Sequence, residues 1–151
     1  MKEKVYLAGS CSSEQRTIMQ HIAARLREAE YDVYCPFELK IPDAWSYSQE
    51  EWAMRVFEKD IAAIDACDIF LMITPGRHST AGTNWEQGYA YAKGKRIEVI
   101  QYTKEQTSLM TYCAAKHFVN CTESELTSIA LAAVDGVYDH YYSNICETVL
   151  T

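Results

Sequence analysis

The chain has 151 residues, of which 48% are hydrophobic and 23% are charged, and its formal net charge is −7. This length and hydrophobic content fit a single domain over residues 1–151 and exclude global disorder. An acidic chain is a poor candidate for binding a nucleic acid polymer or a membrane surface, although a helix N-terminus can still hold a small anion.

Hydrophobic runs and cysteines bear on the cellular compartment. No apolar run reaches the roughly 20 residues of a membrane span, and the polar start Met1–Lys4 lacks the apolar core of a signal peptide. The cysteines are scattered, without C-x-x-C or zinc-ligand spacing: Cys11, Cys35, Cys67, Cys113, Cys121 and Cys146. We therefore expect reduced thiols, no metal site and a cytoplasmic protein.

Strand-like and helix-like segments alternate along the chain. Short apolar runs predict strands at residues 5–8, 32–35, 68–73, 96–102 and 117–120. Capping-box spacings predict helices that begin at Ser12, Ser48 and Thr122. A further helix is expected over residues 82–93 with Gly94 as its C-terminal cap, and a helical turn over 108–114. The last helix is expected to bury Leu126, Ile129, Ala130, Ala133 and Val137 on one face.

This alternation predicts an α/β fold. We expect a three-layer, flavodoxin/Rossmann-like domain, with a five-stranded, mostly parallel sheet and helices on both faces. Ligands of such sheets bind beyond the carboxyl ends of the strands. The segments that should carry function are therefore Gly9-Ser10 and residues 36–47, 74–86 and 102–110.

Asp60 is an unusual residue in the second predicted helix. It lies four residues after Val56 and three after Phe57, within an apolar stripe that includes Ile64. The spacing predicts that its carboxyl faces the protein. It is either a stripe-edge residue that reaches water or a functional group, because burying an unpaired carboxylate is costly.

Glu86 lies where a loop becomes a helix. Thr83 and Glu86 have capping-box spacing, which offers a purely structural reason for this glutamate. A functional reading competes with it, because Gly88 within the same helix costs up to about 1 kcal/mol relative to alanine. That glycine predicts a close approach of another group to the helix backbone.

Three runs of the chain resemble the nucleoside 2-deoxyribosyltransferase family, including its deoxynucleoside 5′-monophosphate N-glycosidase branch. Residues 5–10, Val-Tyr-Leu-Ala-Gly-Ser, resemble the family's opening strand and loop. Residues 59–68 resemble its helix-borne aspartate. Residues 82–90 followed by Lys93-Gly94-Lys95 resemble its G-x-x-x-E-x-G-x-A…GK signature.

The resemblance implies an enzyme of the N-glycosidic bond that needs no cofactor and acts on a nucleoside or nucleotide. Glu86 would be the nucleophile, Tyr6 would hold it by a hydrogen bond, and Asp60 would protonate or position the leaving base. Ser108-Leu109-Met110 resembles a segment that reaches into a neighbour's active site, which implies a homodimer or higher oligomer. The implied substrate-binding residues are Gly9, Ser10, Phe37, Trp45, Thr80, Gly82, Ser108 and Met110. Phe37 and Trp45 would stack on the nucleobase or form a hydrophobic lid over the core.

The family resemblance leaves two alternatives for the acceptor of the sugar: another nucleobase, as in the transferases, or water, as in the monophosphate hydrolases. Transferases of free nucleosides carry an acidic residue six positions before the nucleophile, where this chain has Thr80. The monophosphate hydrolases resemble the chain better at this point, since hydroxyls can donate hydrogen bonds to a phosphate. A non-catalytic nucleotide-binding module is a further alternative. An NAD or flavin enzyme is disfavoured, because the chain lacks G-x-G-x-x-G after its first strand.

Overall fold

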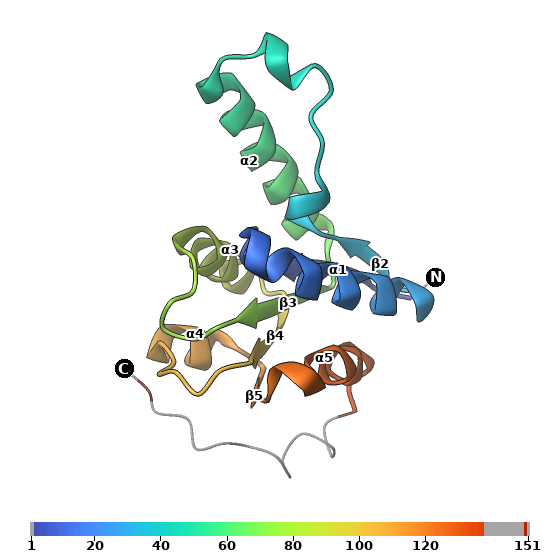
Figure 1. Ribbon diagram of the computed structural model, residues 1–151, viewed down its shortest axis with the longest axis vertical. Helices are drawn as coiled ribbons and strands as arrows, with labels where there is room; N and C mark the ends of the chain where they lie inside the picture. Colours follow the sequence, from blue (N-terminus) through green and yellow to red (C-terminus); the bar gives the residue numbers. More distant parts are fainter. Residues whose placement is uncertain (1, 138–149, 151) are drawn as a thin grey trace.

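The computed structural model describes residues 2–137 and 150 (Figure 1). Its strands are β1 (Lys4–Ala8), β2 (Asp32–Tyr34), β3 (Ile69–Thr74), β4 (Arg96–Gln101) and β5 (His117–Asn120). Its α-helices are α1 (Ser13–Glu28), α2 (Gln49–Ala66), α3 (Ala81–Ala92), α4 (Leu109–Ala114) and α5 (Leu126–Asp135). Single 3-10 turns lie at Pro36–Glu38, Ala44–Ser46 and Glu123–Glu125.

The five strands form one sheet in the order β2-β1-β3-β4-β5. All four pairings are parallel, so the predicted α/β fold and flavodoxin-like order are confirmed and the sheet is wholly parallel. The predicted strands agree with the observed ones to within one residue at each end. The order places β3 at the centre between β1 and β4, where both faces of each strand are covered.

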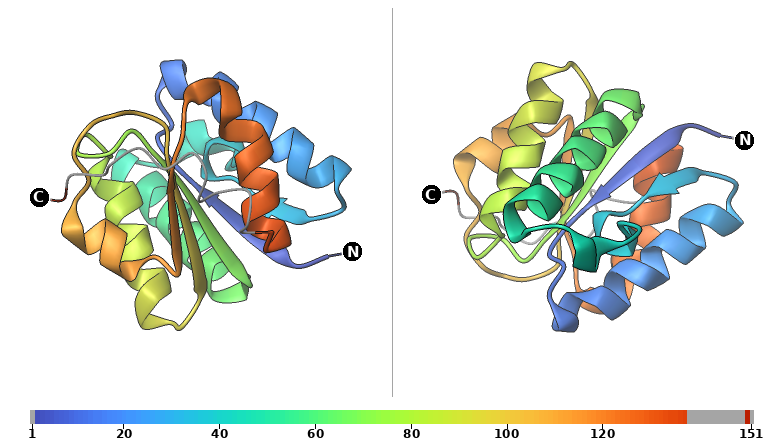
Figure 2. Two further views of the ribbon diagram at one scale, coloured as in Figure 1. Left: turned by 90° about the horizontal axis from the view of Figure 1, so that it is seen from below. Right: turned by 90° about the horizontal axis from the view of Figure 1, so that it is seen from above.

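Helices cover both faces of the sheet, as predicted. α1 and α5 lie on one side and α2, α3 and α4 on the other (Figure 2). Successive side chains of a strand point to opposite faces. Val5 and Leu7 therefore join the core under α1 and α5, whereas Tyr6 and Ala8 join the core under α2 and α3. The alternation along β1 thus sends the Tyr6 side chain to the α2/α3 side.

Two of the three predicted capping boxes are present. The Ser48 side chain accepts from the Glu51 amide and starts α2, and Thr122 with Glu125 forms the box at the 3-10 turn that leads into α5. The box predicted at Ser12 was wrong: Ser12 is the N-cap of α1 but makes no side-chain cap. Gln15 instead donates to the Tyr102 hydroxyl, because α1 packs beside the end of β4.

The last helix is shorter than predicted. Gly136 has a left-handed backbone (φ 74°) and ends α5 at Asp135, so Val137 lies beyond the helix and is exposed. Gly94 adopts the same region (φ 72°) after α3, which confirms its predicted cap role. Lys95 then donates to the backbone oxygens of Asp65 and Cys67 at 2.7 and 2.9 Å. The Gly-Lys pair of the signature thus fastens the C-terminal end of α2 to the start of β4.

The N-terminal half of α2 and the loop before it project beyond the sheet (Figure 1). Ile64 is the only fully buried residue of α2. The apolar stripe that contains Asp60 is therefore only partly buried, because the helix extends past the body of the domain. Trp52 and Phe57 are exposed, while Asp60 is half-buried near the sheet.

Three further expectations concern membrane spans, cysteines and metal sites. Within residues 2–137 and 150, no helix is long and apolar enough to cross a membrane. The five cysteines in that part of the chain are free thiols, and Cys146 lies outside it. The same described residues contain no cluster of three or more His, Cys, Asp or Glu side chains that could hold a metal ion.

Candidate active site

Tyr6 and Glu86 meet on the α2/α3 side of the sheet. Tyr6 is fully buried in β1 and its hydroxyl donates a hydrogen bond to Glu86 Oε2. Glu86 lies in the second turn of α3 and is half-buried. Oε1 of the same carboxyl is not engaged by Tyr6. The hydrogen bond between Tyr6 and Glu86, which the family resemblance implies, is thus present although the two residues are 80 positions apart in the sequence.

Asp60 has a partner that the sequence analysis missed. The Tyr34 hydroxyl, at the end of β2, donates to Asp60 Oδ1 at 2.7 Å. Tyr34 lies opposite Tyr6 in the parallel register, and the two rings stack with centroids 5.4 Å apart. The only sequence signal was the position of Tyr34 near the carboxyl end of a predicted strand, where ligands of such folds bind.

The two carboxylates line one cavity between α2 and α3. Its volume is about 470 Å³, within the range of small-molecule sites. Apart from Asp60 and Glu86 its walls are mainly apolar: Trp52, Ala53, Val56, Phe57, Ile61, Ile64, Gly82 and Trp85. Phe57 and Trp85 contact each other at the rim, with ring centroids 5.5 Å apart. Asp60, Gly82 and Glu86 were predicted from the sequence, whereas the aromatic rim was not.

Burial and mutual repulsion set the ionisation of this site. Burial, together with the nearby Asp60 charge, raises the pKa of Glu86 to about 7, although the Tyr6 hydrogen bond opposes the rise. Burial also raises the pKa of Asp60, and the Tyr34 hydrogen bond opposes that rise. Burial and the Glu86 charge raise the pKa of Tyr6 far above its usual range, so its hydroxyl stays protonated. Two carboxyls with raised pKa values in one cavity are typical of a catalytic site.

The structural alternative for Glu86, a capping box with Thr83, is not what the structure shows. Thr80 is the N-cap of α3 and its hydroxyl accepts from the Thr83 amide. The helix begins three residues earlier than that prediction required, so the Glu86 carboxyl does not cap it and turns to Tyr6. The close approach predicted at Gly88 was also wrong within this chain, since a Cβ there would meet nothing within 4 Å.

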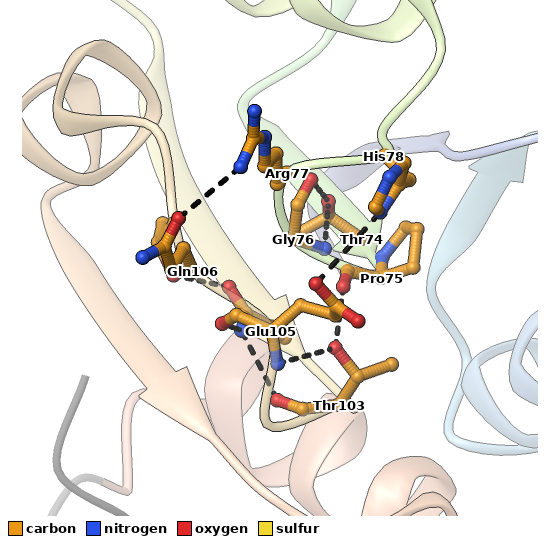
Figure 3. Close-up of polar contacts among 10 residues, drawn as sticks. Thr74, Pro75, Gly76, Arg77, His78, Thr103, Glu105 and Gln106 are labelled. Carbon is orange, nitrogen blue, oxygen red and sulfur yellow. Dashed lines mark hydrogen bonds and ion pairs between the residues drawn. The ribbon is translucent and has the colours of Figure 1, made fainter. Parts of the chain in front are cut away.

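The loops after β3 and β4 are joined by polar contacts (Figure 3). The Arg77 amide donates to the Gln106 carbonyl at 2.7 Å, and the Thr103 hydroxyl donates to the Pro75 carbonyl. The buried Gln101 amide donates to the carbonyls of Thr103 and Glu105. Together these bonds fix the loop that leads to Thr80 and Gly82 against the loop that leads to Ser108.

His78 belongs to the same pair of loops. Its ring is exposed and lies 3.8 Å from the Glu105 carboxylate, as the close-up shows (Figure 3). His78 is therefore part of the contact between these two loops.

The remaining predicted site residues lie outside the lining of the Glu86 cavity. Gly9 and Ser10 follow β1, where a Cβ on Gly9 would lie 2.7 Å from Met19 Cε, so a larger residue there would require the Met19 side chain to move. Phe37 packs against the core on the α1/α5 side, and Trp45 is 87% exposed, so neither lines the cavity of Glu86.

Ser108 and Met110 line a second groove. This groove lies between α3 and α4, and Gln87 and Gly88 also line it. The structure therefore does not bring these two residues to Glu86 of their own chain.

A buried tyrosine on a carboxylate, beside a second carboxylate in an apolar cavity, suits attack on a glycosidic carbon. The family model described as nucleoside 2-deoxyribosyltransferase matches residues 5–131. The chain therefore belongs to the nucleoside 2-deoxyribosyltransferase family, which confirms the resemblance drawn from its motifs. This places it among enzymes of glycosyl transfer and N-glycosidic bond cleavage on nucleosides.

Solved structures share the fold. A 2-deoxyribosyltransferase from Bacillus psychrosaccharolyticus is 26% identical, with 82% of this chain and 90% of that chain covered and a TM-score of 0.69. A conserved protein from Enterococcus faecalis V583 is 21% identical, covers 86% and 98%, and has a TM-score of 0.67. The CMP N-glycosidase BcmB from Clostridium botulinum is 20% identical, covers 84% and 97%, and has a TM-score of 0.59. No curated protein matches the chain.

Proposed function

We propose that the protein cleaves the N-glycosidic bond of 2′-deoxynucleosides or their 5′-monophosphates and transfers the deoxyribosyl group to another nucleobase. The observation that carries this proposal is the Tyr6–Glu86 hydrogen bond at the wall of the cavity that Asp60 also lines. A carboxylate with one oxygen held by a protonated phenol presents its other oxygen to a bound sugar.

The proposed reaction has two displacements at the anomeric carbon. Glu86 Oε1 forms a bond to C1′ while the C1′–N bond breaks, and the departing base takes a proton from Asp60. A second base then gives its N–H proton to Asp60 as it forms a bond to C1′, and the ester bond to Glu86 breaks to restore the carboxylate. Tyr6 donates to Oε2 throughout and stabilises the carboxylate as it leaves.

The neighbouring residues would bind the two halves of the substrate. We assign the sugar and its 5′ substituent to Gly9 and Ser10 in the loop after β1 and to Thr80 and Gly82 at the start of α3, of which Gly82 lines the cavity. The apolar rim of Phe57 and Trp85 replaces Phe37 and Trp45 as the proposed contact of the nucleobase, because it lines the cavity.

A hydrolase is the second candidate, with water instead of a base as the acceptor. One observation favours it: the cap of α3 is the hydroxyl of Thr80, so this position offers hydroxyl donors and no carboxylate to repel a 5′-phosphate. In that case the two displacements are the same, and the second one is made by water.

An activity panel tests the function and separates the two candidates. The four deoxynucleosides and their 5′-monophosphates are incubated with and without a free base, and products are separated by chromatography. Base exchange on nucleosides supports the transferase, and base release from monophosphates alone supports the hydrolase. Glu86→Ala should abolish either activity, whereas Glu58→Gln, on the exposed side of α2, should not. A panel without Glu86-dependent release would leave a binding module as the better description.

We further propose that the active sites are shared between copies of the chain. Met110 on α4 is 73% exposed and Trp85 on α3 is 52% exposed, so two apolar surfaces of one chain lack cover within the described residues. A second copy would bring Ser108 and Met110 to the cavity of Glu86. Glu86→Ala and Met110→Glu variants should each be inactive, and mixing them should restore part of the activity through mixed dimers. Unchanged inactivity in a verified mixed dimer would contradict shared sites.

A further inference from the structure

Tyr34 is the only tyrosine of β2, and its side chain lies on the same face as Tyr6. The rings of Tyr34, Tyr6 and Phe70 come from paired positions of three parallel strands and stack at 5.4 Å intervals. Two of these three rings carry a hydroxyl, and each hydroxyl donates to a different carboxylate of the cavity. The parallel register therefore produces two tyrosine–carboxylate pairs side by side.

Lys95 anchors the C-terminal end of α2, but the part of the helix around Asp60 has few buried contacts. α2 projects beyond the sheet, and only Ile64, one turn further on, is fully buried (Figure 1). A side chain on such a helix keeps its rotational freedom unless a bond restrains it. The Tyr34 hydroxyl, held by ring stacking on Tyr6, gives Asp60 that restraint at 2.7 Å.

We propose that Tyr34 is a positioning residue for Asp60, which it holds with Oδ1 occupied and Oδ2 turned to the leaving base. This inference rests on the proposed function, in which Asp60 delivers a proton to that base. Tyr34 touches neither the base nor the sugar in this arrangement. It acts by restricting the acid to one orientation, and such orientation contributes to rate.

The surroundings of Asp60 determine what removal of the hydroxyl would do. The titratable groups that face it are Tyr34 from β2, Tyr6 from β1, Glu86 from α3 and Cys11 from the loop after β1. None of them is a cation, so burial dominates and raises the pKa of Asp60. The Tyr34 hydrogen bond is the force that opposes this rise, and its loss should raise the pKa of Asp60 further.

The test compares Tyr34→Phe with a matched control. Tyr31→Phe is that control. The Tyr31 hydroxyl makes a similar bond of 2.6 Å to Asp135 of α5, on the face of the sheet opposite the cavity. Phenylalanine keeps the stacked ring at position 34 and the aromatic ring at position 31. The first readout is the ¹³C chemical shift of the Asp60 carboxyl against pH, assigned with Asp60→Asn. The second is kcat and KM for substrates with good and poor leaving bases.

Tyr34→Phe should move the Asp60 titration to higher pH and lower kcat for poor leaving bases roughly tenfold, with KM changed less than about twofold. Good leaving bases should be affected less than about threefold. In an Asp60→Asn background the same change should add less than about twofold, since the two residues act through one another. Tyr31→Phe should change none of these quantities.

Three results would overturn the proposal: an unmoved Asp60 titration, an equal loss for all leaving bases, or full additivity with Asp60→Asn. Failure of the proposed function has a different signature, namely a wild-type protein without Glu86-dependent base release. The carboxyl titration does not depend on turnover, so it decides the coupling of Tyr34 to Asp60 in either case.

Discussion

Glu86→Gln should make the protein more stable at neutral pH. In the native state the pKa of Glu86 is raised from 4.5 to about 7, mainly by burial. Between these values the native state binds more protons than the unfolded state, so the free energy of unfolding falls as the pH rises through this window. At about 1.4 kcal/mol per pH unit, the interval corresponds to at most roughly 3 kcal/mol.

Glutamine removes this loss because it cannot ionise, and it still accepts the hydrogen bond from Tyr6. The variant and wild type should therefore be equally stable at pH 4, whereas at pH 8 the variant should be more stable by about 1–3 kcal/mol. Urea unfolding followed by circular dichroism at both pH values measures the difference. Glu58→Gln is the control and should change the free energy of unfolding by less than about 0.5 kcal/mol at either pH.

Equal stability of Glu86→Gln and wild type at pH 8 would refute the reasoning. It would mean that Glu86 is hydrated in the native state and is not held in a site that disfavours its charge. A gain of stability together with a loss of activity is the expected pattern for a residue retained for function.

Three further predictions concern the pH profile and two structural residues. Because Glu86 must be ionised to attack, the wild-type rate should rise with a midpoint near pH 7 and fall about tenfold from its plateau by pH 6, and a flat profile from pH 5 to 8 would contradict this. Gly76→Ala should lower the free energy of unfolding in urea by about 2–3 kcal/mol, because φ is 98° and the new Cβ would lie 2.9 Å from the Gln106 carbonyl oxygen. The control Gly94→Ala, where φ is 72° and the new Cβ meets no other atom, should lower it by only about 1 kcal/mol. Lys95→Met should cost about 1–2 kcal/mol, because it removes two hydrogen bonds to the end of α2 and its C-cap. Lys93→Met, whose partner Asp65 is exposed, should cost less, and equal losses would contradict the anchoring role of Lys95.

The sheet could be predicted because its signals are local. Each strand is a short apolar run, and residues 117–120 were placed to the residue. Alternation of strands and helices then leaves few topologies, and the flavodoxin-like order is one of them. Helix starts were harder to predict, because the capping-box spacing, a Ser or Thr with Glu or Gln three residues later, also occurs where no capping box forms. Ser12 and Thr83 both fit the spacing, and tertiary contacts of Gln15 and Glu86 decided against them.

The site could be predicted only in part, for a related reason. Asp60 could be recognised as a carboxylate within an apolar helix stripe, and Glu86 as a carboxylate in a glycine-containing helix start. Tyr6 could be recognised as a polar ring in a buried strand. The role of Tyr34 depends on the pairing of β2 with β1, which places it opposite Tyr6. Register of parallel strands is a long-range property that a single sequence does not specify. The aromatic rim was missed because Phe57 and Trp85 fit the pattern of ordinary core residues.

The raised pKa of Glu86 has opposing effects on the two steps of the proposed reaction. Burial makes the ionised carboxylate a stronger nucleophile, but it also reduces the ionised fraction at neutral pH and makes the carboxylate a poorer leaving group in the second step. The Tyr6 hydroxyl acts against both disadvantages, since its hydrogen bond stabilises the charged form in each state. Tyr6→Phe should therefore slow the second step more than the first, so the glycosyl-Glu86 ester should accumulate during turnover. Denaturing mass spectrometry of acid-quenched samples would detect it in Tyr6→Phe and not in Glu86→Gln. A Tyr6→Phe enzyme that is slow without such accumulation would show that the hydroxyl serves only the attack.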